Sequence, residues 1–145
     1  MKRWIPIIVL LLGMAGMHSV MADTPDKFQP FLGRWRLDST LAFRCPCTLD
    51  IREAQENGSV VGSFYLADGQ DVLTEAKIVE AKHTRELTVT LLRGDKGWLE
   101  LSQDRQHLSG LWERLLRRAG GTPHSRTSRI TFAKIVQEQE PAATK

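Results

Sequence analysis

The stretch FLGRWRL at residues 31–37 decides the fold, because the folded part of the chain is predicted to begin there. Gly33 permits a turn or a close backbone approach that a side chain would block. Trp35 follows where a strand enters a core. It can bury a large apolar area there while its indole N–H finds an acceptor. The strands predicted after residue 37 are short and are expected to close over this Trp.

Residues 1–22 are predicted to be a secretory signal peptide. A basic start (MKR) precedes an apolar run from Trp4 to about Gly16, and the small-residue pattern of a cleavage site ends at Ala22. The apolar run is shorter than the roughly 20 residues of a membrane span, although an uncleaved anchor is the alternative. We therefore expect a mature chain that starts at Asp23, has no transmembrane segment after cleavage, and is periplasmic or secreted.

The charge of the mature chain is close to neutral. The sequence holds 20 Lys and Arg against 17 Asp and Glu, and the leader contains two of the bases and no acid. The remaining net charge of +1, together with export, argues against nucleic acid as a partner. About 120 residues remain, which is enough for one domain with one core.

Alternation with a period of two predicts an all-β chain. Leu87, Val89 and Leu91 alternate with threonines, and Asn57-Gly58 is a strong hairpin signal. Strands are expected at about 31–38, 47–54, 59–66, 72–81, 86–92, 98–102, 107–116 and 128–136, with a short helix near 108–116 as an alternative. A polar lead-in (23–30), a long loop (117–127) and a disordered tail (137–145) complete the chain. The fold class predicted for 31–136 is an eight-stranded antiparallel up-and-down β-barrel, because closure removes exposed edges.

The Gly33-Arg34-Trp35 motif near the start of this pattern resembles the Gly-x-Trp signature of the avidin and lipocalin (calycin) barrels. The avidin-like resemblance continues in GSVVGSF at 58–64, LTVT at 87–90, Leu111-Trp112, and TFAKI at 131–135. It implies a small-ligand-binding barrel, and it leaves open whether the barrel pairs into homo-oligomers, as avidin-like proteins do.

The resemblance departs at the positions that bind biotin. Ser39 and Trp112 match the family's ligand Ser and one of its Trp residues. The pocket's Tyr, its buried Asp and its middle-strand Trp correspond to Phe64, Ile130 and Leu91. A site built on buried hydrogen bonds loses much affinity without its polar partners, so the resemblance supports the fold and argues against biotin.

Candidate ligand-binding residues are Trp35, Ser39, Phe64, Trp98 and Trp112, with Tyr65 beside them. Together they would line a cavity for an apolar or amphipathic molecule. The alternative is that the aromatic residues fill the barrel as core, because small barrels usually fill their interiors.

Cys45 and Cys47 are the only cysteines, and export favours their oxidation to a disulfide. Such a bond closes a very short loop and would stabilise little. Reactive thiols, a link to another chain, and a metal pair with a His are the alternatives. The spacing is not a usual zinc pattern, so we expect no metal and no cofactor.

The densest positive region follows residue 113. Partner-binding candidates are Arg117, Arg118, His124 and Arg126, flanked by Arg114 and Arg129. They would bind an anionic partner such as lipid headgroups, polyanionic glycans or an acidic protein surface, or else form a solvated basic loop.

The sequence shows no nucleophile constellation, so the protein is not expected to be an enzyme. The leading functional hypothesis is an exported barrel that binds a small apolar or amphipathic ligand. The alternative is an envelope interaction module, such as a hydrolase inhibitor or a complex subunit.

Overall fold

A computed structural model describes residues 23–38, 45–117 and 119–136. The predicted signal peptide, Ser39, Arg118 and the predicted tail at 137–145 lie outside the described residues. The elements are a 3₁₀-helix, η1 (Asp26–Phe31), and the strands β1 (Gly33–Leu37), β2 (Thr48–Ala54), β3 (Val60–Tyr65), β4 (Leu73–Glu80), β5 (Arg85–Leu91), β6 (Lys96–Leu101), β7 (His107–Leu116) and β8 (His124–Lys134).

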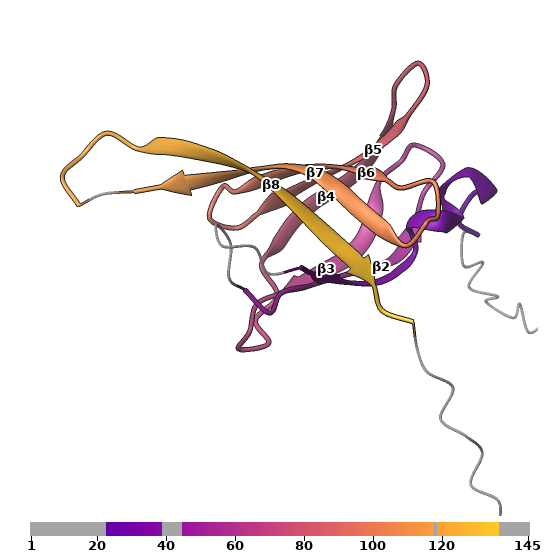
Figure 1. Ribbon diagram of the computed structural model, residues 1–145, viewed down its shortest axis with the longest axis horizontal. Helices are drawn as coiled ribbons and strands as arrows, with labels where there is room; N and C mark the ends of the chain where they lie inside the picture. Colours follow the sequence, from indigo (N-terminus) through magenta and orange to yellow (C-terminus); the bar gives the residue numbers. More distant parts are fainter. Residues whose placement is uncertain (1–22, 39–44, 118, 137–145) are drawn as a thin grey trace, which may run out of the picture.

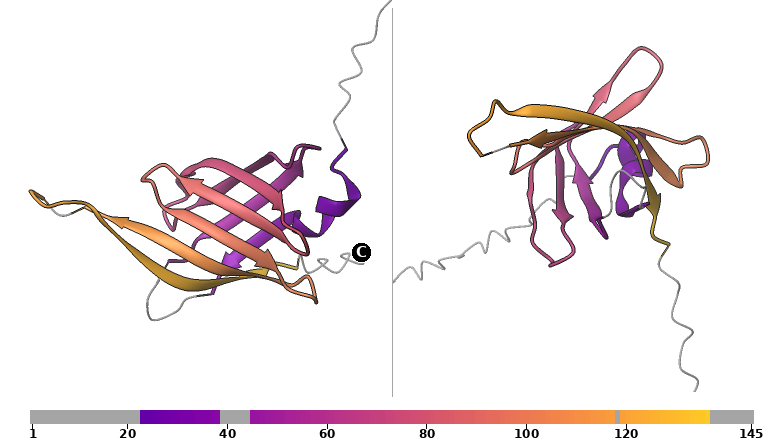
Figure 2. Two further views of the ribbon diagram at one scale, coloured as in Figure 1. Left: turned by 90° about the horizontal axis from the view of Figure 1, so that it is seen from above. Right: turned by 60° about the vertical axis from the view of Figure 1, so that its left-hand side comes forward.

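Every neighbouring pair of strands is antiparallel, and the sheet order is β3-β2-β1-β8-β7-β6-β5-β4. Because β1 pairs with β8, the meander curls round on itself, as Figures 1 and 2 show. The prediction of an eight-stranded antiparallel barrel is therefore confirmed, and the helical alternative for residues 108–116 is wrong because these residues belong to β7.

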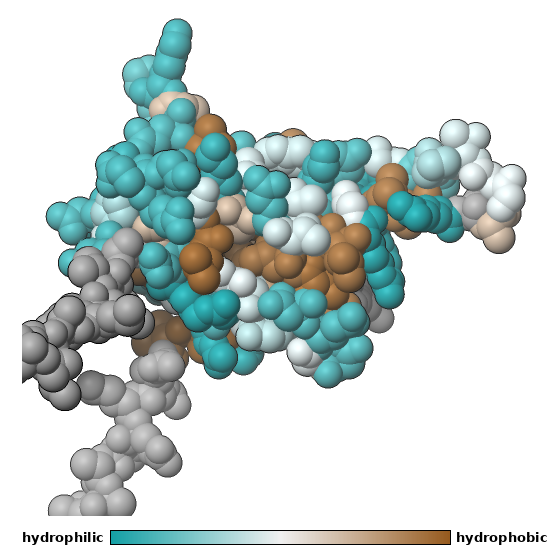
Figure 3. Space-filling view, turned by 180° about the vertical axis from the view of Figure 1, so that it is seen from behind, coloured by the Kyte–Doolittle hydropathy of each residue, from teal (hydrophilic) through white to brown (hydrophobic). Residues whose placement is uncertain are grey.

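The barrel is nearly, but not fully, closed between β3 and β4. The two strands share only isolated bridges, Ser59 with Lys77 and Tyr65 with Asp71. Val61 and Val79, one from each strand, are among the exposed large apolar residues. From behind, the molecule shows a band of apolar side chains bordered by hydrophilic ones (Figure 3). The seam between β3 and β4 is thus the least tightly paired part of the wall.

Alternation along each strand builds the core. In β5, Leu87, Val89 and Leu91 are buried, whereas the threonines between them are partly exposed. Inward-facing residues of all eight strands then fill the interior. The largest side chains with almost no exposure are Trp35, Trp112, Phe28, Phe31, Phe64 and Phe132. Burial of such side chains is the main stabilising contribution to the fold.

The helix η1 lies in the segment that was expected to be a simple lead-in, and it covers one end of the barrel. Phe28 and Phe31 from this helix are buried in the core, and the Phe31 carbonyl accepts the Trp35 indole N–H at 3.0 Å. Another side chain from the segment, Thr24 Oγ1, accepts the Ala54 amide at 3.0 Å. The expected acceptor for the Trp indole is therefore the turn that precedes its own strand.

The loop predicted at 117–127 is shorter than expected, because β8 already begins at His124. Register pairs continue outward to Leu116 opposite His124. The β7–β8 hairpin consequently extends beyond the barrel wall, and Figure 1 shows it projecting at the left.

Candidate functional site

Three aromatic side chains meet inside the barrel. Phe64 stacks against Trp112 with ring centroids 5.6 Å apart and planes 28° apart. Phe132 packs on both rings, at 6.2 Å from Phe64 and 6.4 Å from Trp112. All three residues are at most 1% exposed. Direct ring contact at this spacing leaves no room for a ligand between Phe64 and Trp112.

The space for the Trp112 indole is provided by a glycine on the neighbouring strand. Gly97 lies opposite Trp112, and a Cβ placed there would come within 2.5 Å of the indole atoms Cε3 and Cζ3. The indole therefore rests on bare backbone, which gives it one fixed position in the core.

Trp35 is also fully buried, at the base of the interior. The Lys134 ammonium lies 5.0 Å from its ring centroid and 3.4 Å from the Pro30 carbonyl oxygen, to which it donates. Burial lowers the pKa of Lys134 from its ordinary value. A cation over the indole and an acceptor for its N–H make Trp35 a structural anchor that joins β1, β8 and η1.

Trp98 does not join the other aromatic residues. It pairs with Thr88 and Leu111, and its neighbours Gly97 and Leu99 are the buried positions of β6. Its side chain is therefore on the outer face of the sheet. Of the predicted ligand set, the structure brings together Phe64 and Trp112, with Trp35 in the same core, while Trp98 lies on the other side of the wall.

The remaining positions tied to the resemblance are apolar and buried. Ile130 is 3% exposed and Leu91 is 7% exposed. Both contribute to the hydrophobic core, and neither supplies a polar partner for a bound molecule.

The projecting hairpin carries the basic residues. Between residues 113 and 129 the sequence contains five Arg and one Glu. Near the base of the hairpin, the Leu115 amide of β7 donates to Asp95 Oδ1, in the turn that precedes β6, at 3.0 Å. The predicted partner residues Arg117, His124 and Arg126 are all exposed on this hairpin.

Strand alternation decides which side of the hairpin is basic. Trp112 and Phe132 point into the barrel, so residues an even number of positions away on the same strand fall on the same side. The resulting pairs are Arg114 with Arg126 and Leu116 with His124. The face that continues from the barrel interior therefore presents two Arg and one His at the end opposite η1.

A disulfide joins Cys45 and Cys47. Cys47 is fully buried, and Cys45 packs against the core from a partly exposed position. Among the predicted alternatives, this arrangement agrees with a structural disulfide. No group of three or more His, Cys, Asp or Glu side chains able to hold a metal occurs in the described part of the chain.

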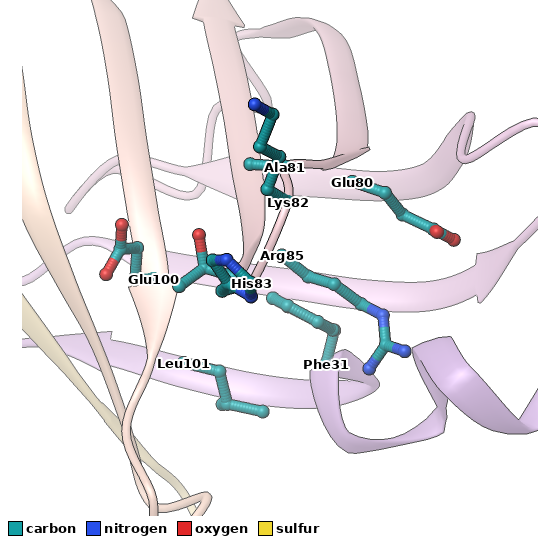
Figure 4. Close-up of a pocket in the computed structure, with 9 residues that line it drawn as sticks. Phe31, Glu80, Ala81, Lys82, His83, Arg85, Glu100 and Leu101 are labelled. Carbon is teal, nitrogen blue, oxygen red and sulfur yellow. The ribbon is translucent and has the colours of Figure 1, made fainter.

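A surface hollow lies at the covered end of the barrel, beside the β4–β5 turn (Figure 4). Lys82, His83 and Arg85 line it, and Arg85 extends toward η1. The nearby Glu80 is already paired with Lys27 at 2.8 Å, and the hydrogen bond from Lys27 holds the pKa of Glu80 below its ordinary value. None of the predicted site residues lines this hollow.

Sequence reasoning missed the pairing of Arg114 with Arg126, because Gly120, Gly121 and Pro123 indicated a long loop. Residues 124–128 are all polar, so the sequence contains no apolar alternation that would indicate the earlier start of β8. Among the described residues, no helix is long and apolar enough to span a membrane.

No protein-family model matches the sequence, and no curated protein matches it. Two solved structures are similar in fold. The bradavidin2–biotin complex has a TM-score of 0.50 and 14% identity, covering 72% of this chain and 96% of that chain. Xenavidin has a TM-score of 0.48 and 16% identity, with the same coverage of 72% and 96%. The likeness to bradavidin2 shows that the fold is an avidin-like barrel.

Proposed function

We propose that this chain is an exported, non-catalytic binding protein that uses the β7–β8 hairpin to contact an acidic surface on another envelope protein. The observation that carries the proposal is the projection of a strongly basic hairpin from a barrel whose aromatic interior is packed. A basic surface that stands away from the body of the protein can reach an acidic partner without a deep pocket.

The chemistry of the hairpin suits carboxylate groups. Arg126 lies directly opposite Arg114, so two guanidinium groups project from neighbouring positions on one face. Guanidinium groups form paired, charge-assisted hydrogen bonds with carboxylates. Among the described residues, no ion pair is recorded for Arg117 or Arg126.

The test uses a fluorescently labelled poly-glutamate peptide as the acidic probe. We expect the double variant Arg117→Glu/Arg126→Glu to bind it at least about tenfold more weakly than the native protein. The matched control is Arg36→Glu/Lys82→Glu, which makes the same change in net charge at exposed positions on β1 and the β4–β5 turn. If the two variants bound the probe equally, net charge and not the hairpin would explain binding, and the proposal would fail.

A second candidate function is the binding of a small apolar or amphipathic ligand in the barrel. It is favoured by the fold, since bradavidin2 was solved with biotin, and by the Phe64–Trp112–Phe132 cluster. Entry of a ligand would require the Phe64 and Trp112 rings to separate. Tryptophan fluorescence titrations with biotin, fatty acids and lysophospholipids test this function, and flat titrations with all three would exclude these ligands.

A further inference from the structure

A second hollow lies at the end of the barrel that η1 covers, between this helix, the start of β5 and the β6–β7 turn. Its volume is about 520 Å³. The charged side chains that line it are Lys27, Arg85, Arg105 and Lys134 together with Asp26 and Asp104. Cations are therefore in excess in this hollow, although the mature chain as a whole is close to neutral.

Lys134 is held in place by the structure around it. Its Cε atom lies over Gly33, where a Cβ would come within 3.2 Å of it. The ammonium lies 5.0 Å from the ring centroid of the buried Trp35, in favourable cation–π contact. The lysine thus reaches the hollow already ordered, so a ligand that binds there does not have to fix a mobile side chain.

The hydrogen-bonding capacity of the Lys134 ammonium is largely unused. An ammonium has three N–H donors, and the Pro30 carbonyl oxygen accepts one at 3.4 Å, which is long for a charged donor. Within the described residues, no ion pair is recorded for Lys134. Burial lowers its pKa, as expected for a cation that loses water without gaining a counter-ion. An anion in the hollow would supply the missing acceptors.

Two guanidinium groups add to the positive lining. Arg85 begins β5, and Figure 4 shows its side chain extending toward η1. Arg105 lies in the β6–β7 turn, which also forms part of the wall. Both residues are exposed, and the described part of the chain contains no salt bridge to either of them. Arg85 and Arg105 can therefore turn their N–H donors toward an anion beside Lys134.

The remaining charges limit the size of that anion. Lys27 is already paired with Glu80 at 2.8 Å. Asp104 accepts hydrogen bonds within its own turn, one of them from the Gln106 amide at 2.9 Å. Without Lys27, three cations remain against the two carboxylates Asp26 and Asp104. This local excess suits a compact anionic group, whereas a long polyanion would also meet the carboxylates.

We propose that this hollow binds the phosphate group of a small phosphate monoester through Lys134, Arg85 and Arg105. A phosphate monoester carries between one and two negative charges near neutral pH and offers three strong acceptor oxygens. Guanidinium and ammonium groups are the side chains that proteins use to bind phosphate. The same group occurs on soluble esters and on the headgroup of phosphatidic acid, and the two sources are separated by experiment.

Differential acetylation tests the site in the full chain. The protein is treated with acetic anhydride at constant ionic strength, with glycerol 3-phosphate, with vesicles of phosphatidylcholine and phosphatidic acid, or with neither. Mass spectrometry of chymotryptic peptides then gives the reactivity of each lysine. We expect one of the probes to protect Lys134 about fivefold or more, while the exposed Lys77 and Lys96 react at unchanged rates.

Each outcome of this assay has one meaning. Protection of Lys134 by glycerol 3-phosphate supports a site for soluble esters, and protection by the vesicles alone supports a site for the lipid headgroup. Protection by neither probe would overturn the proposal. Equal protection of Lys134, Lys77 and Lys96 would also overturn it, because the effect would then not be specific to the hollow.

Substitution of the two arginines tests the rest of the site. Arg85→Gln and Arg105→Gln should each raise the probe concentration that half-protects Lys134 by at least about fivefold. Arg93→Gln is the matched control, because Arg93 is an exposed arginine in the β5–β6 turn at the other end of the barrel. An equal rise in Arg93→Gln would show that general positive charge explains the binding, and the proposal would fail. Circular dichroism of the three variants checks that the barrel stays folded.

The site is independent of the function proposed for the β7–β8 hairpin. The hairpin variant Arg117→Glu/Arg126→Glu changes no residue of the hollow, so protection of Lys134 should persist in it. Loss of protection in this variant would overturn the assignment of phosphate binding to the hollow. Failure of the hairpin to bind poly-glutamate would leave the assignment unchanged.

Discussion

Replacing Trp35 by Phe tests how the first strand is anchored. The change removes the indole N–H and leaves the buried Phe31 carbonyl oxygen without its donor at 3.0 Å. Leaving a buried acceptor unsatisfied costs about 1–3 kcal/mol. The smaller ring also leaves about 40 Å³ unfilled, which adds about 1 kcal/mol. We therefore expect the free energy of unfolding to fall by about 2–4 kcal/mol.

Urea unfolding followed by far-UV circular dichroism measures this loss without relying on tryptophan emission. With a slope of about 1.5 kcal/mol per molar urea, the midpoint should fall by about 1.3–2.7 M. Trp98→Phe is the matched control, because Trp98 lies on the outer face, and its cost should stay below about 1 kcal/mol. A shift under about 0.3 M for Trp35→Phe, or an equal shift for Trp98→Phe, would refute the assignment of Trp35 as the buried anchor.

Three further outcomes follow from the structure. Gly97→Ala should lower the free energy of unfolding by about 1–3 kcal/mol, because the added methyl group meets the Trp112 ring; an unchanged thermal midpoint would contradict this contact. Burial raises the pKa of Asp71, but hydrogen bonds from the Leu73 and Phe64 backbone amides outweigh it and hold this pKa below its ordinary value. The stability contributed by the Asp71 charge is thus present above about pH 4 and lost as pH falls through the lowered pKa, so urea midpoints of the native protein and Asp71→Asn should converge in acid. Reducing the Cys45–Cys47 disulfide should lower stability by at most about 1.5 kcal/mol, because the loop is so short, and a larger loss in urea unfolding would disprove this account.

The barrel could be predicted from the sequence because strand alternation is a local property. Leu87, Val89 and Leu91 indicate a buried face without any knowledge of what they contact. The indole of Trp35 needs an acceptor wherever it is buried, so this requirement could also be stated in advance. Which residue supplies the acceptor could not be stated, because the turn ending at Phe31 was expected to be a polar lead-in.

The position of Trp98 could not be inferred from its type. Aromatic residues are favoured on both faces of a strand, so the identity of Trp98 gives no direction. Trp98 is placed on the outer face only because the next residue in β6, Leu99, is buried, and adjacent residues of a strand point to opposite faces. The length of the hairpin was missed for a related reason. Beyond the barrel, no core imposes an apolar alternation, so a paired strand of polar residues such as His124 to Thr127 has the composition of a loop.

The seam between β3 and β4 has a consequence for how the molecule opens. The bridges Ser59–Lys77 and Tyr65–Asp71 belong to one register, so the wall can part and rejoin along this line without any strand sliding. Thermal breathing of the cylinder should therefore concentrate there, and amide protons of the intervening segments should exchange with deuterium sooner than those between β7 and β8. Local opening of the barrel should therefore occur first along the β3–β4 seam, while the paired strands of the opposite wall keep their hydrogen bonds.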